Sequence, residues 1–268
     1  MGETVLFIGI DYSGAETARS RLPGLQVYAA GPDGIPRRQK PPPTSAASKA
    51  INWSRSEVAQ WLTGLALEGT RFIAGIDHNF SFPDSYFARY DLRDWPQFLA
   101  DFVQHWPTDQ DGVHVDSVRD GSLAKRAGSS PGTRIGASNE FRLCERWTSS
   151  AKSVFQFDVQ GQVAKSSHAG IPWLKRIRDE AGEHIHFWPF DGWAPAPGKS
   201  LIAEIYPSVL RRRFKAEDRS PDEHDAYSVA RWLAQSDADG ILERYFSPPL
   251  TTAERAVADR EGWILGVT

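Results

Sequence analysis

The chain has 268 residues, 40% of them apolar and 24% charged, so it is long enough to bury a core and too apolar for global disorder. Its formal net charge of −3 disfavours a dedicated nucleic-acid binder, because such proteins gain much of their affinity by neutralising phosphates. The single cysteine, Cys144, rules out an intrachain disulfide and a cysteine-rich metal site. We expect it to be packed in a helix, in a reducing compartment.

The first apolar run, residues 5–10, is expected of a strand buried on both faces, and it ends at Asp11. It is too short for a membrane span and lacks the basic start and cleavage site of a signal peptide. No longer apolar run follows. We therefore expect a soluble, cytoplasmic protein with no membrane partner.

A second strand is predicted over residues 25–30, and residues 35–40 form a candidate third strand after a turn. Ser54 and Glu57 form a capping-box pattern that predicts a helix ahead of the next apolar strand, which ends at Asp77. Further helices are expected over residues 95–106, 139–147, 171–180, 220–235 and 251–260, with strands over 184–188 and 201–206. Residues 116–138 are predicted as a loop. This order predicts a mixed sheet with helices packed on its faces.

Three apolar strands each carry one acidic residue: Asp11, Asp77 and Glu204. Each has an ordinary explanation, because aspartate is common where strands give way to turns and a single strand glutamate can face solvent. In a doubly wound sheet, however, residues just past the carboxyl ends of neighbouring strands meet in one crevice. We therefore treat the three acids as a candidate cluster.

The helix predicted at residue 220 adds two more acids. Asp222 lies in its first turn, where the helix dipole alone favours an acid. Asp225 shares a face with Asp222 and with the apolar stripe that should pack inward. A carboxylate directed at the core is costly unless it is paired, hydrogen-bonded or metal-bound. Asp225 is thus the best single indication of a site.

Several carboxylates in one place repel one another, and a hard divalent cation such as Mg²⁺ or Mn²⁺ is the usual remedy. Two such ions, about 3.5–4 Å apart, activate water and stabilise the leaving oxygen in phosphodiester cleavage. The residue types suit that chemistry, although the sequence alone does not show that they converge.

Asp11 at the end of the first strand, Asp77 at the end of the fourth and the Asp222–Asp225 pair on a late helix resemble the ribonuclease H-like superfamily, and most closely RuvC-type resolvases. More narrowly, residues 9–14, 75–77, 203–207 and 222–226 resemble the family called domain of unknown function 429, a family of predicted nucleases of this fold. The resemblance spans most of the chain, and the order and spacing of its short motifs make it moderately specific.

The resemblance implies one ribonuclease H-like domain over residues 1–268, with a large insertion at about 79–200 before the last core strand. It implies metal-dependent phosphodiester hydrolysis, with Asp11 and Asp77 holding the metals, Asp222 and Asp225 completing the coordination, and Glu204 ligating or orienting water. The insertion is too long for a simple connection and is a candidate lid, substrate pocket or partner surface.

Several other residues are candidates for substrate binding or proton transfer. Ser13 follows the first acid, and a tract of three arginines begins at Arg211. Arg134 lies in the glycine- and serine-rich stretch, and these cations suit contacts with substrate phosphates as well as plain solvation. His78 and His224 flank candidate acids, and we expect no direct catalysis by His224. Further basic and polar candidates are Lys125, Arg126, Arg142, Arg146 and residues 158–168.

Three functions remain open. The first is a metal-dependent nuclease, and the second is a small-molecule phosphoesterase or phosphotransferase. A full actin-like kinase is disfavoured because the chain is short and lacks a glycine-rich adenosine-binding segment. The third is a non-catalytic module that binds nucleic acid or protein, which the retention of so many like charges disfavours. The oligomeric state is not predicted.

Overall fold

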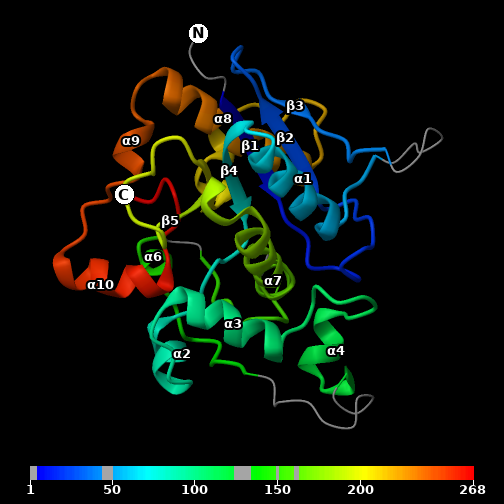
Figure 1. Cartoon of the computed structure of the whole chain (residues 1–268), viewed down its shortest axis with the longest axis vertical. Coiled ribbons are helices and arrows are strands. Elements are labelled where there is room, and N and C mark those ends of the chain that lie inside the picture. Colours follow the sequence, from blue (N-terminus) through cyan, green and yellow to red (C-terminus); the bar gives the residue numbers. More distant parts are fainter. Residues whose placement is uncertain (1–4, 44–50, 124–133, 149–150, 160–162) are drawn as a thin grey trace.

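The computed structural model describes residues 5–43, 51–123, 134–148, 151–159 and 163–268. In these ranges the chain forms a six-stranded mixed sheet with the order β3-β2-β1-β4-β6-β5 (Figure 1). β2 is antiparallel to β1 and β3, whereas β1, β4, β6 and β5 pair in parallel. The predicted α/β class and mixed sheet are confirmed. The strands are β1 (Val5–Asp11), β2 (Gln26–Ala30), β3 (Arg37–Arg38), β4 (Arg71–Asp77), β5 (Ile185–Trp188) and β6 (Ser200–Glu204).

The helices of the described ranges are α1 (Arg55–Leu67), α2 (Asp84–Arg89), α3 (Trp95–His105), α4 (Val115–Arg119), α6 (Leu143–Arg146), α7 (Ala164–Ala181), α8 (Pro221–Ala238), α9 (Leu242–Tyr245) and α10 (Thr252–Glu261). The capping box predicted at Ser54 and Glu57 is present at the start of α1. α7 begins at Ala164, earlier than the start predicted at residue 171, and Pro172 lies inside it. α4 lies in the stretch predicted as a loop.

α8 packs directly on the sheet, because two glycines let its backbone approach. A side chain on Gly9 would place its Cβ 2.1 Å from the carbonyl oxygen of Ala226, and one on Gly75 would lie 2.7 Å from Val229 Cγ1. On the opposite face, Ile8, Ile10 and other β1 and β4 side chains join a core that includes buried residues of α1 and α7. The sheet is therefore covered on both faces, with α8 held at a fixed height above β1 and β4.

Part of the segment predicted as an insertion belongs to the sheet layers. β5 pairs with β6 and forms one edge of the sheet, and α7 packs against α1. α2, α3 and α4 lie together below the sheet in the view of Figure 1. None of the helices in the described ranges is long and apolar enough to cross a membrane.

Candidate functional site

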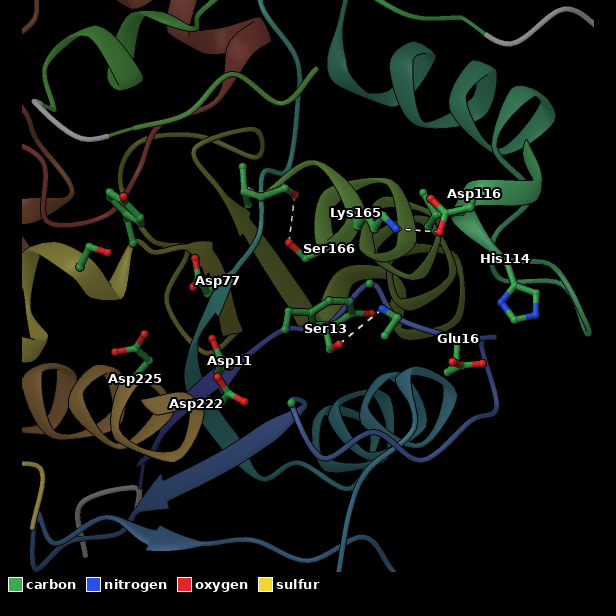
Figure 2. A pocket seen from close by; sticks show the side chains of 18 of the residues that line it. Asp11, Ser13, Glu16, Asp77, His114, Asp116, Lys165, Ser166, Asp222 and Asp225 are labelled. Atoms are coloured by element: carbon green, nitrogen blue, oxygen red, sulfur yellow. Dashed lines mark hydrogen bonds and ion pairs between the residues drawn. The ribbon is translucent and has the colours of Figure 1, made fainter. Parts of the chain in front are cut away.

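A cleft of about 700 Å³ opens at the carboxyl ends of β1 and β4, beside the start of α8 (Figure 2). Asp11 and Asp77 line it from the sheet, and Asp222 and Asp225 line it from the helix. Asp11 and Asp77 are register partners on adjacent parallel strands, and such strands lie about 4.8 Å apart. The structure thus brings together all four residues that were predicted to hold metal.

The local sequence explains how α8 presents its two acids. Ser220 caps the helix and forms a capping box with Glu223, and Pro221 occupies the first helical position. These residues fix where the helix begins, so Asp222 falls in the first turn and Asp225 one turn later on the same face. Gly9 beneath the helix allows that face to lie close to the sheet.

Loss of hydration on burial raises the pKa of both Asp11 and Asp77, and the surrounding carboxylates raise both values further. For Asp77 the main charged contributors are Asp225 and Glu204, and their effect is partly offset by Asp11 and by Arg211. The pair therefore favours a shared proton, or an added cation, over two free charges.

The two acids on α8 are also only partly neutralised. Burial and neighbouring Glu223 raise the pKa of Asp222. Burial raises the pKa of Asp225 as well, against the opposing effect of Arg211, whose Nη1 lies 3.3 Å from Asp225 Oδ2. Asp225 Oδ1 is buried without a hydrogen-bond partner. A buried carboxylate oxygen without a donor is costly.

Glu204 lies outside this cleft, unlike the other four acids predicted to be catalytic. Its carboxylate accepts hydrogen bonds from Arg142 Nη1 at 2.7 Å and from the Phe80 amide at 2.9 Å, and Arg142 Nη2 also contacts it. The cause is strand register: Gly75 pairs with Ala203 and Ile76 pairs with Glu204. Side chains alternate along a strand, so Asp77 shares the α8 face with Gly75, whereas Glu204 points to the other face.

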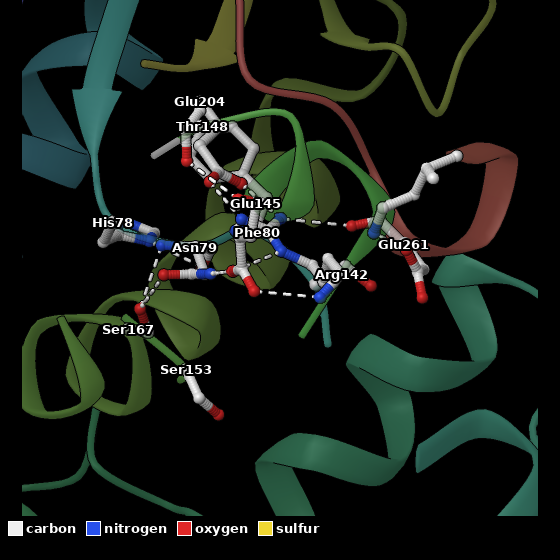
Figure 3. A network of polar contacts seen from close by, with 12 residues as sticks. His78, Asn79, Phe80, Arg142, Glu145, Thr148, Ser153, Ser167, Glu204 and Glu261 are labelled. Atoms are coloured by element: carbon white, nitrogen blue, oxygen red, sulfur yellow. Dashed lines mark hydrogen bonds and ion pairs between the residues drawn. The ribbon is translucent and has the colours of Figure 1, made fainter. Parts of the chain in front are cut away.

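Arg142 is the centre of a buried polar network (Figure 3). It is fully buried and also donates to Glu145 Oε1 at 2.9 Å and to the Glu261 carbonyl at 3.1 Å. Asn79 Nδ2 donates to Glu145 Oε1 at 2.5 Å, and Ser167 Oγ donates to Asn79 Oδ1 at 3.0 Å. The network joins the end of β4 to β6, α6, α7 and α10. Arg142, which we considered for the substrate rim, is thus a structural counter-charge.

As with the acids, some of the predicted substrate-binding residues line the cleft and others do not. Ser13 and Arg211 line the cleft. Arg134 does not, because its Nη1 pairs with Asp101 Oδ1 at 2.9 Å and its guanidinium stacks on the Tyr90 ring at 4.5 Å. Its predicted place beside the substrate is wrong for this arrangement. Lys125 and Arg126 lie outside the described residues.

The remaining candidates have structural surroundings. His78 is buried, its Nδ1 lies 2.9 Å from the Asn79 carbonyl, and burial lowers its pKa to about 4. His224 Nε2 lies 3.1 Å from the Arg211 carbonyl, so it ties α8 to the arginine tract. Cys144 is buried, as expected. Arg146 lines a separate groove beside α10.

Several residues at the other end of the cleft had no role predicted for them. His114 and Asp116 come from the start of α4, and Lys165 and Ser166 from the first turn of α7. Lys165 Nζ pairs with Asp116 Oδ2 at 2.7 Å. Lys165 and Ser166 fall in the stretch 158–168, which was named only among the further polar candidates. No pattern in the sequence marked His114 or Asp116.

The four aspartates supply the oxygen ligands that hard divalent cations prefer. Within the described part of the chain, no group of three or more histidine, cysteine, aspartate or glutamate side chains is arranged to hold a metal ion as it stands. The donor chemistry therefore fits Mg²⁺ or Mn²⁺, while the side chains would have to turn toward a shared ion. No family model, curated protein or solved structure matches this chain.

Proposed function

We propose that this protein is a metal-dependent phosphodiesterase, in the first instance a nuclease, that acts at the cleft of Asp11, Asp77, Asp222 and Asp225. The observation that carries the proposal is that four carboxyl groups share one cleft, with Arg211 as the only cation contacting them among the described residues. A fold rarely keeps such repulsion unless a ligand relieves it. We include in the proposal that the sheet is of the ribonuclease H-like type.

Each aspartate has a role in this mechanism that its position supports. Asp11 and Asp77, side by side on the strands, would hold Mg²⁺ or Mn²⁺ once their shared proton is released. Asp225 would contribute the oxygen that has no partner, and Asp222 would complete the set from the first turn of α8. The bound metal would supply a nucleophilic water and stabilise charge on the phosphate. Arg211, at the edge of the cleft, would contact a phosphate oxygen.

The test is cleavage of labelled RNA, DNA, hybrid and junction substrates with Mg²⁺ or Mn²⁺. We expect cleavage that a chelator abolishes and that Asp77→Asn or Asp225→Asn lowers by about 100-fold or more, because removing a group that stabilises the transition state costs about this much. Asp237→Asn is the matched control, since Asp237 is exposed near the other end of α8. Cleavage that survives both cleft substitutions would contradict the proposal.

The same assay separates the alternatives. Binding of a substrate without cleavage would favour a non-catalytic module. Hydrolysis of small phosphate esters, with every polymer left intact, would favour a small-molecule phosphoesterase.

A further inference from the structure

The cleft has a second end that the four aspartates do not explain. Figure 2 shows Lys165, Asp116 and His114 set apart from the four aspartates, with Ser13 and Ser166 between the two groups. These side chains come from the loop after β1, the first turn of α7 and the start of α4. They include hydroxyl, carboxylate, ammonium and imidazole groups, which together donate and accept hydrogen bonds.

The loop that forms one wall of this end is held rigidly. Arg55 is fully buried and donates to the carbonyl oxygens of Ser13 at 3.0 Å, Ala15 at 2.7 Å and Glu16 at 3.1 Å. A Cβ on Gly14 would lie 2.1 Å from the Lys165 carbonyl carbon, so the loop and the start of α7 touch through their backbones. A buried arginine devoted to three loop carbonyls indicates a preorganised wall.

The charge of the cleft indicates what it can hold. Among the described residues, six carboxyl side chains line it against the cations Lys165 and Arg211; the six are Asp11, Glu16, Asp77, Asp116, Asp222 and Asp225. A polyanion needs several cationic contacts, and this lining opposes them. Carboxylates, hydroxyls and a lysine suit the hydroxyl groups of a sugar instead. The volume of about 700 Å³ also lies in the range of small-ligand pockets.

We propose that this second end is a subsite for one hydroxylated, sugar-bearing group attached to the scissile phosphate. The substrate is then a small nucleotide diester or the end of a strand, and not the interior of a duplex. This inference rests on the proposed function. Water adds its oxygen to phosphorus and the bond from phosphorus to the leaving oxygen breaks; one of the two water protons passes to the leaving oxygen and the other is released to solvent.

Two esters with the same leaving group test the subsite with the intact protein and Mn²⁺: uridine 5′-(4-nitrophenyl phosphate) and methyl 4-nitrophenyl phosphate. We expect kcat/KM to favour the uridine ester by about tenfold or more, the effect of one or two added hydrogen bonds. Equal efficiency would overturn the inference alone. Absence of hydrolysis for both esters and for every nucleic acid would remove the proposed function as well.

Two substitutions locate the subsite. Lys165→Met removes its ammonium, and Gly24→Val narrows the junction of the two ends, since a Cβ there would lie 3.4 Å from Asp222 Oδ2 and 3.7 Å from Ser13 Oγ. We expect each to lower the ratio of the two kcat/KM values by about tenfold. Lys175→Met is the matched control, because Lys175 pairs with Asp179 elsewhere on α7. Ratios unchanged in both variants would contradict the assignment.

A linear and a circular single-stranded oligonucleotide of the same sequence distinguish the two sources of substrate. Release of single nucleotides from the linear strand alone would identify a strand end as the substrate. Hydrolysis of the uridine ester with neither strand cleaved would identify a small diester. Cutting of the circle as fast as the linear strand would overturn the inference, because a circle has no end to enter the subsite.

Discussion

Two groups of acids lie at the same end of this sheet and differ in their counter-charge. On one face, Arg142 binds Glu204 and Glu145 directly, and the carboxylate of Glu261 accepts the backbone amides of Leu143 and Asp84. On the other face, the four aspartates of the cleft contact only Arg211 among the cations that the structure describes, and at its edge. Among the described residues, the first group has its counter-charge within the chain, and the second is the group for which we propose a bound metal ion.

This difference teaches how to separate structural from functional acids in a fold. A buried carboxylate with a fully buried arginine and backbone donors has no remaining capacity for a ligand. A partly buried carboxylate that shares a proton with its neighbour, or that has an oxygen without a donor, retains that capacity. Position in the sequence does not separate the cleft from the network, because Asp77 lines the cleft and Asn79, close to it in the chain, belongs to the network.

The largest effect is expected on removing the counter-charge of the network. Arg142→Met leaves Glu204 and Glu145 buried without their cation, so we expect the free energy of unfolding to fall by about 3–5 kcal/mol. Urea denaturation followed by tryptophan fluorescence measures this. Arg146→Met, at the exposed last residue of α6, the helix that Arg142 precedes, should change stability by less than about 0.5 kcal/mol. Similar stabilities of the two variants would show that the network is not structural.

Isosteric amides in the two groups should act in opposite directions. Glu204→Gln weakens charged hydrogen bonds to Arg142, and we expect a loss of about 2 kcal/mol. Asp77→Asn relieves repulsion among the cleft acids, so at pH 8 in chelator we expect a gain of about 1 kcal/mol. Thermal and urea unfolding of both variants measures whether each substitution raises or lowers the free energy of unfolding. A destabilised Asp77→Asn would indicate that Asp77 is structural as well.

The pH dependence of stability should come from the cleft. Burial and nearby carboxylates raise the pKa of Asp77 to about 8 from an ordinary 3.8. The folded state then holds a proton that the unfolded state releases. The resulting stabilisation is complete below about pH 4 and is lost as the pH rises to about 8, by up to about 1.4 kcal/mol per pH unit. We expect a smaller decline in Asp77→Asn, measured by urea unfolding in chelator.

Divalent metal should reverse this decline. Metal binding requires deprotonated carboxylates, so Mg²⁺ or Mn²⁺ should raise the unfolding temperature more at pH 8 than at pH 5.5. The effect should be absent in Asp225→Asn and retained in the surface variant Asp237→Asn. Equal stabilisation by Mg²⁺ at both pH values would place its binding elsewhere.

The sequence predicted the acids of the cleft better than it separated them from the network. Gly9 and Gly75 each precede an aspartate by two residues, and Ala203, the register partner of Gly75, precedes Glu204 by one. Small residues therefore mark the face of each strand that packs against α8. The spacing from these residues to the acids is a signal that could have shown that Glu204 points to the opposite face. The spacing is interpretable only when the strands are aligned.

Other features depended on contacts between distant segments. Arg142 lies 62 positions before its partner Glu204, and nothing near it in the sequence marks it as a buried counter-charge. Lys165 and Ser166 occupy the first turn of α7, a helix that was predicted only from residue 171 onward. The side of the cleft built by α4 lies in a stretch with no apolar periodicity. Strand register, pairing between distant residues and short helices therefore account for the differences between the predicted site and the observed one.

The smallest effect on stability is expected at Arg211, the cation that contacts the four-aspartate group. Arg211 is half exposed, its side chain being 46% accessible, so Arg211→Met should change the free energy of unfolding by less than about 0.5 kcal/mol. Its loss should raise KM for a phosphodiester several-fold with kcat nearly unchanged, because a peripheral phosphate contact serves ground state and transition state alike. Arg212→Met, the next residue and exposed, is the control. If Arg211→Met instead destabilised the protein as much as Arg142→Met, the two groups of acids would be neutralised in the same way, and the cleft would need no ligand.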